Sequence, residues 1–336
     1  MLKTRICDLL GIETPIFCAA MGGVALGELA AAVSEAGALG SLSSAGFGVS
    51  GVQHEIAEAK RLTRKPFAVG LLIPLLREGV FEAVLDARVP AIIFFWGDAA
   101  PFIPQCKAAG IKTIVQVGSA AEAFQAKAAG ADVIIAQGLE AGGHVRGTVT
   151  TFVLIPAVRD AIGDTPLIAA GGIADGRGLA AAIALGADGA MFGTRFIATR
   201  ESAAHPIYKR RVTEAREDQT VYTMLFDIGW PDAPHRVLPN RTIEEWERAG
   251  RPESGKRPGE GEVIGHSRRG DLEIPLVRYG VHNPSGFVEG DVEGMALYAG
   301  QSAGLVNDLL PAAEVVRRIE SEAHAAIANR LAPLAR

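Results

Sequence analysis

The chain has 336 residues and a formal net charge of -5, and hydrophobic residues make up 49% of it. This length allows a large buried core, whereas the mixed charge offers neither a basic face for nucleic acid nor a polybasic arm for an anionic membrane. No apolar run approaches the roughly 18 residues of a membrane span, and the first residues lack the apolar segment of a signal peptide. We therefore expect a soluble cytoplasmic protein, a monomer or homodimer, without nucleic-acid or membrane partners.

The three cysteines, Cys7, Cys18 and Cys106, lie far apart in the chain. They cannot form a paired disulfide framework, and their spacing is not that of metal ligands. A lone cysteine is most often a small buried residue. We therefore predict no metal site and no cysteine chemistry.

Short apolar runs alternate with alanine-rich amphipathic segments over the first two hundred residues, as in parallel strands joined by helices. There are eight such runs: 15–20, 39–45, 67–73, 91–96, 113–117, 132–137, 167–170 and 189–192. Eight units predict a TIM-type (β/α)8 barrel over residues 1–202. An open doubly wound sheet is the alternative, but its glycine fingerprint usually follows the first strand, and here the glycine-rich loops come late.

A short repeat supports the alternation. Lys107-Ala-Ala-Gly110 returns as Lys127-Ala-Ala-Gly130, and each copy precedes an apolar run. Glycine is the usual residue just after the end of a helix. The repeat therefore predicts two equivalent helix-to-strand junctions.

Proline, glycine and charged residues dominate residues 203–294, which predicts an inserted loop-rich or helical small domain after the eighth strand. We expect this domain to act on substrate or as a lid. Its aromatic residues Trp230, Trp246 and Tyr279 either select the substrate or pack the domain itself. Residues 295–336 are predicted to form two helices, 297–308 and 312–330, that pack back on the barrel.

Two glycine-bearing loops follow the last two barrel strands, where such barrels often bind phosphate. Residues 169–178 read Ala-Ala-Gly-Gly-Ile-Ala-Asp-Gly-Arg-Gly, and residues 193–195 read Gly-Thr-Arg. Adjacent glycines permit close backbone approach to a ligand. We predict a phosphate-bearing ligand here, although tight turns alone would also explain the glycines.

His144 stands in a third loop, residues 137–147, directly after the sixth strand. A histidine with an ordinary pKa of about 6.5 is mostly neutral at physiological pH and can act as a base. The alternative is a solvent-exposed loop histidine. We expect His54 and His324 to be solvated and His205 to be structural, and we assign no role to His235, His266 and His282.

At this point the chain resembles the FMN-dependent nitronate monooxygenases, long called 2-nitropropane dioxygenases, and their relatives the flavin enoyl-acyl-carrier-protein reductases and flavin quinone reductases. The resemblance spans nearly the whole chain. It rests on the motifs at residues 20–23, 28–40, 140–144, 170–178 and 193–202. The family often has proline before the methionine of the first motif, where this chain has Ala20.

The resemblance implies that FMN is the cofactor and that His144 is the catalytic residue. It also implies fourteen cofactor-binding residues: Ala20, Met21, Gly22, Gln116, Gln137, Gly143, Ala170, Gly171, Gly172, Gly193, Thr194, Tyr298, Gly300 and Gln301. Among them, Gly171, Gly172, Gly193 and Thr194 would hold the phosphate.

The implied function is the oxidation of alkyl nitronates, with a small-molecule substrate and oxygen as co-substrate. His144 would deprotonate a neutral nitroalkane or orient the nitronate. The main alternative is an NAD(P)H-dependent FMN reductase of enoyl thioesters, quinones or other activated alkenes. A flavin-free enzyme acting on a sugar or nucleotide phosphate and a non-enzymatic flavin carrier are two further alternatives.

Overall fold

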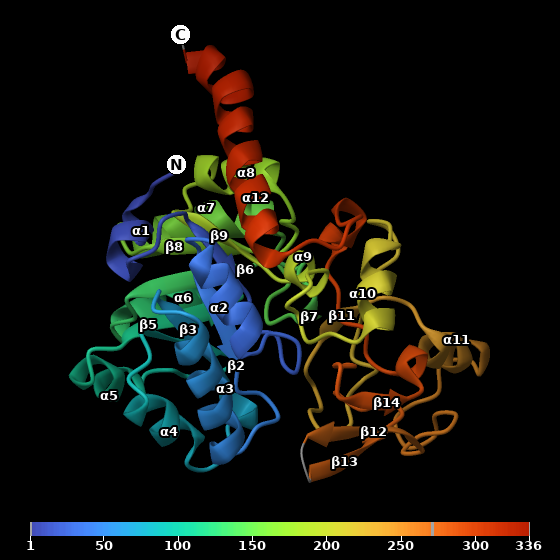
Figure 1. Ribbon diagram of the computed structural model, residues 1–336. Coiled ribbons are helices and arrows are strands. Elements are labelled where there is room, and N and C mark those ends of the chain that lie inside the picture. Colours follow the sequence, from blue (N-terminus) through green and yellow to red (C-terminus); the bar gives the residue numbers. More distant parts are fainter. Residues whose placement is uncertain (1, 270–271, 336) are drawn as a thin grey trace.

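The computed structural model describes residues 2–269 and 272–335, so Met1, Gly270, Asp271 and Arg336 lie outside the described residues. Eight parallel strands form the centre of the molecule (Figure 1). They are β1 (Ile16–Cys18), β2 (Gly40–Ser43), β3 (Phe67–Leu72), β4 (Ala91–Phe95), β5 (Lys112–Val117), β6 (Val133–Gln137), β8 (Leu167–Ala170) and β9 (Gly189–Phe192). Their order is β1-β9-β8-β6-β5-β4-β3-β2, and a parallel bridge between Phe17 and Leu39 closes the ring. The predicted barrel is confirmed, and the open sheet is excluded.

Alternate residues of each barrel strand face two different cores, because side chains point to opposite sides of a strand. In β4, Ala91 and Ile93 pack with the barrel interior, whereas Ile92 and Phe94 pack under the surrounding helices. Helix α1 (Arg5–Leu10) adds its apolar face to the interior cluster, where Ile6 is fully buried. The barrel is therefore a filled core whose functional surface lies at one end.

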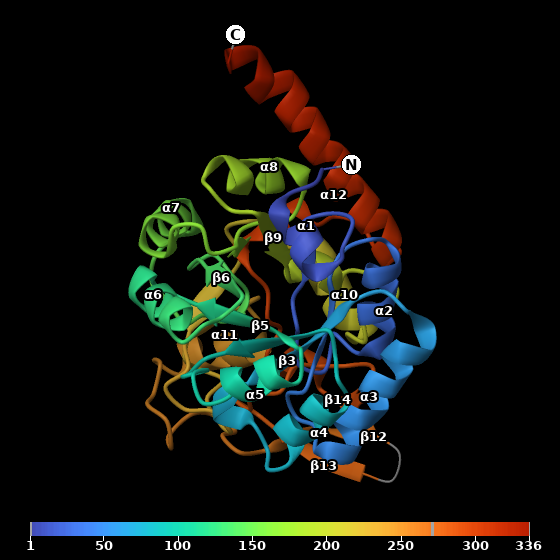
Figure 2. The same ribbon diagram turned by 90° about the vertical axis from the view of Figure 1, so that its left-hand side faces the viewer.

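Helices surround the barrel (Figure 2). They are α2 (Gly27–Glu35), α3 (Val49–Leu62), α4 (Val80–Asp86), α5 (Ile103–Ala108), α6 (Ala120–Ala128), α7 (Thr151–Ile162) and α8 (Gly176–Ala184), with the short 3-10 helix η1 (Ile73–Leu75) after β3. The repeated junctions are confirmed, since Gly110 and Gly130 follow α5 and α6 in left-handed backbone conformations, with φ of 74° and 93°. All three cysteines are buried, as expected for lone cysteines.

The segment after β9 contains more strand than the sequence indicated. Its elements are α9 (Thr194–Ile197), α10 (Pro206–Thr213), β10 (Val221–Thr223), β11 (His235–Val237), α11 (Arg241–Arg248), β12 (Val263–Arg269), β13 (Leu272–Val277), β14 (Val288–Gly290) and η2 (Val292–Gly294). One small sheet has the order β13-β12-β14, and the other has the order β10-β11-β7. Strand β7 (Gly143–His144) belongs to the loop after β6, so this segment is tied to the barrel mouth.

The prediction of a helix over residues 297–308 is wrong. Tyr298 forms an antiparallel bridge with Val237, and Leu238 N–H donates to Leu297 O at 2.8 Å. Only a 3-10 helix, η3 (Gln301–Leu305), follows. These tertiary backbone hydrogen bonds outweigh the weak helix preference of an alanine-containing stretch.

The second C-terminal helix is confirmed as α12 (Ala312–Ala326), which continues as η4 (Ile327–Leu331) and η5 (Ala332–Ala335). Val315, Val316 and Ile319 are buried, and α12 packs on α8 and α2. Its far end extends away from the body of the molecule in both views (Figures 1 and 2). Within residues 2–269 and 272–335, no helix combines the length and apolarity needed to cross a bilayer.

Candidate active site

A cavity of about 900 Å³ opens at the carboxyl ends of the barrel strands, where active sites of this fold lie. Its lining includes thirteen of the fifteen residues predicted for the site: Ala20, Met21, Gly22, Gln116, Gln137, Gly143, His144, Ala170, Gly171, Gly172, Gly193, Thr194 and Tyr298. The fold therefore brings together residues from one end of the chain to the other.

The loops after β8 and β9 present unpaired backbone donors to this cavity. Gly171 and Gly172 have φ of 97° and 72°, a region that favours glycine. Among the described residues, no hydrogen-bond acceptor pairs with the backbone N–H of Gly172, Gly193 or Thr194. Such a set of free N–H groups can bind an anion.

The first motif follows β1 and forms another wall. Ala19 N–H donates to Phe192 O at 3.0 Å, which ties this wall to β9. Ala20 leaves no room for a side chain at Gly70, where an added Cβ would lie 2.3 Å from the Ala20 Cβ. Gly70 lines the cavity and was missed from the sequence, although a glycine inside a strand often marks such a close approach.

The backbone of His144 is fixed rather than free. His144 is paired with His235 through β7 and β11. Gln137 Nε2 donates to His144 O at 3.1 Å, and Gln137 Oε1 accepts from Arg146 N at 3.3 Å. Gln137 thus holds the His144 loop. Gln116 also lines the cavity, but its side chain has no hydrogen-bond partner in the part of the chain that is described.

Aromatic rings surround the His144 imidazole. Trp230 stacks on it with ring centroids 4.1 Å apart and planes at 30°. Trp96, His235 and Tyr298 contact it at centroid distances of 6.2, 5.2 and 5.3 Å. The Nε2 atom is buried and has no hydrogen-bond partner among the described residues. Burial, with a smaller contribution from His235, lowers the pKa of His144 from 6.5 to about 3.

Gly300 and Gln301, the remaining two predicted residues, lie behind the wall rather than on it. Gly300 N–H donates to Thr194 Oγ1 at 3.0 Å, and Gln301 N–H donates to Glu140 O at 3.0 Å. An added Cβ on Gly142 would lie 2.3 Å from Gly300 N. The two glycines let the C-terminal segment pack directly on the His144 loop.

Of the three aromatic residues singled out in the inserted segment, only Trp230 lines the cavity. Tyr279 is fully buried and donates to Pro258 O at 3.0 Å. Trp246 Nε1 donates to Pro252 O at 2.9 Å, and both residues belong to a separate apolar cluster. Trp246 and Tyr279 therefore pack the inserted segment.

The other histidines divide as follows. His54 and His324 are exposed, as predicted, although His54 stands at the cavity rim. The prediction for His205 is also confirmed, because its Nδ1 accepts from Ile207 N and caps α10. His235, which has no predicted role, is fully buried and its ring contacts that of His144. No sequence signal links these two residues, because their pairing depends on the register of β7 and β11.

These residues fit a flavin nucleotide. The free N–H groups of the two glycine loops suit a phosphate, and Gln116 offers an unpaired amide to a polar ring edge. Apolar residues dominate the remaining lining, as in most cofactor pockets. The cavity therefore has both the size and the donor set for such a group.

The chain is similar to several known proteins. The sequence profile of the nitronate monooxygenase family matches residues 3–80 and 76–322. A (3aS,4S,5R,7aS)-5-hydroxy-7a-methyl-1-oxo-octahydro-1H-indene-4-carboxyl-CoA dehydrogenase of Mycobacterium tuberculosis is 35% identical, over 96% of each chain. A probable nitronate monooxygenase of Staphylococcus saprophyticus is 34% identical, over 66% of this chain and 76% of the relative. The structure of FabK from Thermotoga maritima matches with a TM-score of 0.83 and 34% identity, over 98% of each chain.

Both the family profile and the relatives with oxidoreductase names cover most of the chain. The protein is accordingly an oxidoreductase that acts on a small molecule, and its family implies a flavin cofactor. By these matches and by its barrel, the chain belongs to the nitronate monooxygenase family.

Proposed function

We propose that this protein oxidises alkyl nitronates with FMN as cofactor and oxygen as co-substrate. The observation that carries the proposal is the His144 imidazole, which has a buried Nε2 atom and lines the same cavity as the two glycine loops. Its lowered pKa keeps it uncharged at neutral pH. The match to the nitronate monooxygenase profile supports the same reaction.

We also propose that the protein is located in the cytoplasm, because its three buried free thiols fit a reducing compartment.

FMN, when bound, supplies the redox chemistry by accepting electrons from the substrate and passing them to oxygen. The backbone N–H groups of Gly172, Gly193 and Thr194 would hold its phosphate, and Gln116 would contact a polar ring atom. Trp230 and Tyr298 would keep water away from the reacting region. The protein therefore contributes binding, orientation and a dry wall.

A pKa near 3 makes His144 a weak base at neutral pH. Its imidazole suits a hydrogen bond to a nitronate oxygen better than removal of a proton from carbon. We therefore expect preformed nitronates to be better substrates than neutral nitroalkanes. Of the two roles considered for His144, the orienting role is the one that its environment favours.

A second candidate is oxidation or reduction of an acyl thioester. The cavity extends beyond the glycine loops to Ile274 and Leu276 of β13 and to Ser267 of β12, which leaves room for a substrate larger than a simple nitronate. The exposed Arg77 at the cavity rim offers a cation to a phosphate-bearing carrier. A relative that matches over 96% of its own length is named as a carboxyl-CoA dehydrogenase.

An anaerobic titration of the FMN-loaded protein separates these candidates. We expect the visible absorbance of the flavin to bleach with an alkyl nitronate and to remain unchanged with NADH or NADPH. Bleaching by a nicotinamide, followed by reoxidation with an enoyl thioester, would replace the proposal with a reductase. Bleaching by a saturated acyl-CoA alone would favour a dehydrogenase, and a protein that binds no FMN would contradict all three.

A further inference from the structure

Trp230 and His144 form the closest ring contact at the cavity wall, at 4.1 Å between centroids. Trp230 is 7% exposed, so the indole covers one face of the imidazole and is itself covered. Offset stacking of this kind adds to the energy of simple burial and restricts ring rotation. The ring of His144 therefore has one preferred orientation, and Trp230 supplies the surface that fixes it.

The groups around the imidazole contribute little charge of their own. His235 faces it from β11, Tyr298 from the segment before η3, and Trp96 from the end of β4. Two charged groups lie near the outer rings: the Arg146 guanidinium lies over Trp96 at 5.3 Å, and the Asp227 carboxylate interacts electrostatically with His235. No carboxylate in the described part of the chain forms an ion pair or hydrogen bond with His144. Stacking and burial, rather than an ion pair, set the state of this ring.

Trp230 stands at the end of a tight turn that is anchored on both sides. Trp230 N–H donates to Asp227 O at 3.0 Å, and Gly229 has a φ of 101°. Ile228 N–H donates to Tyr279 O at 3.1 Å, and Val281 N–H donates back to Ile228 O at 3.0 Å. The position of the indole thus depends on the position of residues 225–229.

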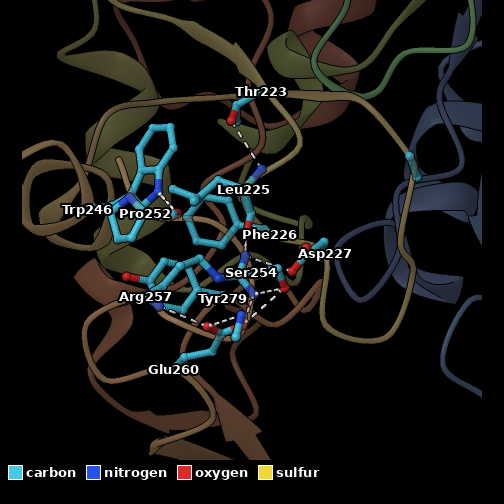
Figure 3. A network of polar contacts seen from close by, with 12 residues as sticks. Thr223, Leu225, Phe226, Asp227, Trp246, Pro252, Ser254, Arg257, Glu260 and Tyr279 are labelled. Carbon is cyan, nitrogen blue, oxygen red and sulfur yellow. Dashed lines mark hydrogen bonds and ion pairs between the residues drawn. The ribbon is translucent and has the colours of Figure 1, made fainter. Parts of the chain in front are cut away.

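Arg257 contacts that turn at Leu225 and Asp227 (Figure 3). Its guanidinium donates to Leu225 O at 2.9 Å and pairs with Asp227 Oδ1 at 2.9 Å. The other end of the guanidinium pairs with Glu260 and donates to Ser254 Oγ. Arg257 is 6% exposed and does not line the cavity. This cluster of the buried Arg257 with the partly buried Asp227 and Glu260 is called the arginine clamp below.

We propose that Trp230 is a positioning residue for His144 and that the arginine clamp keeps Trp230 in place. The proposal rests on the catalytic role of His144 in the proposed function. Without the indole, water reaches the imidazole and the ring samples other rotamers. The hydrogen bond to substrate is then made less often, so kcat falls more than KM rises.

The first test compares Trp230→Leu and Trp230→Phe with the wild type. Trp246→Phe is the matched control, because it alters another tryptophan of the same segment that does not contact His144. The His144 signal in NMR spectra, assigned with a His144 variant, gives its pKa directly. We expect Trp230→Leu to raise that pKa by about one unit or more toward 6.5 and to lower kcat on nitronate roughly tenfold to hundredfold. Trp230→Phe should restore both values, and Trp246→Phe should change neither.

The second test alters the arginine clamp, which does not contact His144 itself. Arg257→Lys keeps the positive charge but loses the planar fork that joins Leu225 O, Asp227 and Glu260. We expect the His144 pKa and kcat to change in the same direction as in Trp230→Leu, by a smaller amount. A folded Trp230→Leu protein with wild-type pKa and kcat would overturn the proposal. A wild-type protein that oxidises no nitronate would instead reject the proposed function, while the NMR titration would still report on the stacking.

Discussion

His144 and His235 lie directly opposite each other on β7 and β11, and their ring centroids are 5.2 Å apart. His235 Nδ1 lies 2.9 Å from Ala233 O, and its Nε2 accepts from Phe226 N at 3.3 Å. These partners fix the neutral tautomer with the proton on Nδ1. Burial lowers the pKa of both histidines, so the pair is uncharged at neutral pH.

This uncharged pair predicts the pH dependence of the reaction. Because the pKa of His144 is lowered from 6.5 to about 3, its neutral form persists as the pH falls from 8 to 5. With a preformed nitronate held in its anionic form, kcat/KM should show no loss attributable to histidine protonation over that range. A profile measured in overlapping buffers checks this. A fall in kcat/KM centred near pH 6.5 would mean that water reaches the imidazole.

Replacement of His144 by alanine tests its role directly. We expect His144→Ala to retain FMN, as judged by the visible spectrum, because the glycine loops that bind the phosphate are untouched. Turnover of nitronate should fall roughly a hundredfold to a thousandfold, the usual loss when one positioned hydrogen-bonding group is removed from an active site. His54→Ala is the control, since His54 is an exposed histidine at the rim of the same cavity. Equal rates in the two variants would contradict the assignment.

Gly193→Ala tests the phosphate site without strain in the protein. Gly193 has a φ of -100°, and an added Cβ would meet only Ala19 Cβ at 3.6 Å and Met21 Sδ at 3.9 Å. The FMN-free fold should keep its melting temperature, whereas the dissociation constant for FMN should rise roughly tenfold, or about 1.4 kcal/mol. Fluorescence titration of FMN measures this. Gly286→Ala is the control, because Gly286 does not line the cavity and its added Cβ would lie 3.5 Å from Ala203 O. An equal rise in the dissociation constant for FMN in this control would argue against the phosphate site.

Glu260 links the stability of the arginine clamp to pH. A hydrogen bond from Arg257 lowers the pKa of Glu260 from 4.5 to about 2. Because the folded pKa is the lower one, the stabilisation is present above about pH 4.5 and is lost as the pH falls toward 2. Glu260→Gln should therefore lower the free energy of unfolding by about 1.5–3 kcal/mol at pH 7.

Denaturant unfolding at several pH values checks this expectation. The difference between wild type and Glu260→Gln should narrow below pH 4.5 as Glu260 takes up a proton. Glu253→Gln provides the comparison, because the Glu253 side chain is 86% exposed and its ion pair with Lys256 should contribute little. A difference that stayed constant from pH 7 to pH 3 would show that the carboxylate charge is not what stabilises the clamp.

The barrel was predictable because its signal is local. Each strand is a short apolar run, and each helix-to-strand junction carries a glycine such as Gly110 or Gly130. The helix predicted over residues 297–308 failed because Leu297 and Tyr298 instead pair with β11. The strands from β10 to β14 were missed for a related reason: they are short, and their partners lie in distant parts of the chain.

The sequence by itself determined the fold class, the two glycine loops and the presence of one histidine at the barrel mouth. Each of these depends on a local pattern, namely apolar periodicity, paired glycines or the position of a residue directly after a strand. Only the tertiary structure decided that Trp230 stacks on His144, that the His235 ring contacts the His144 ring and that Gly300 packs on Gly142. These contacts join segments far apart in the chain, and burial by those segments is what gives His144 its lowered pKa.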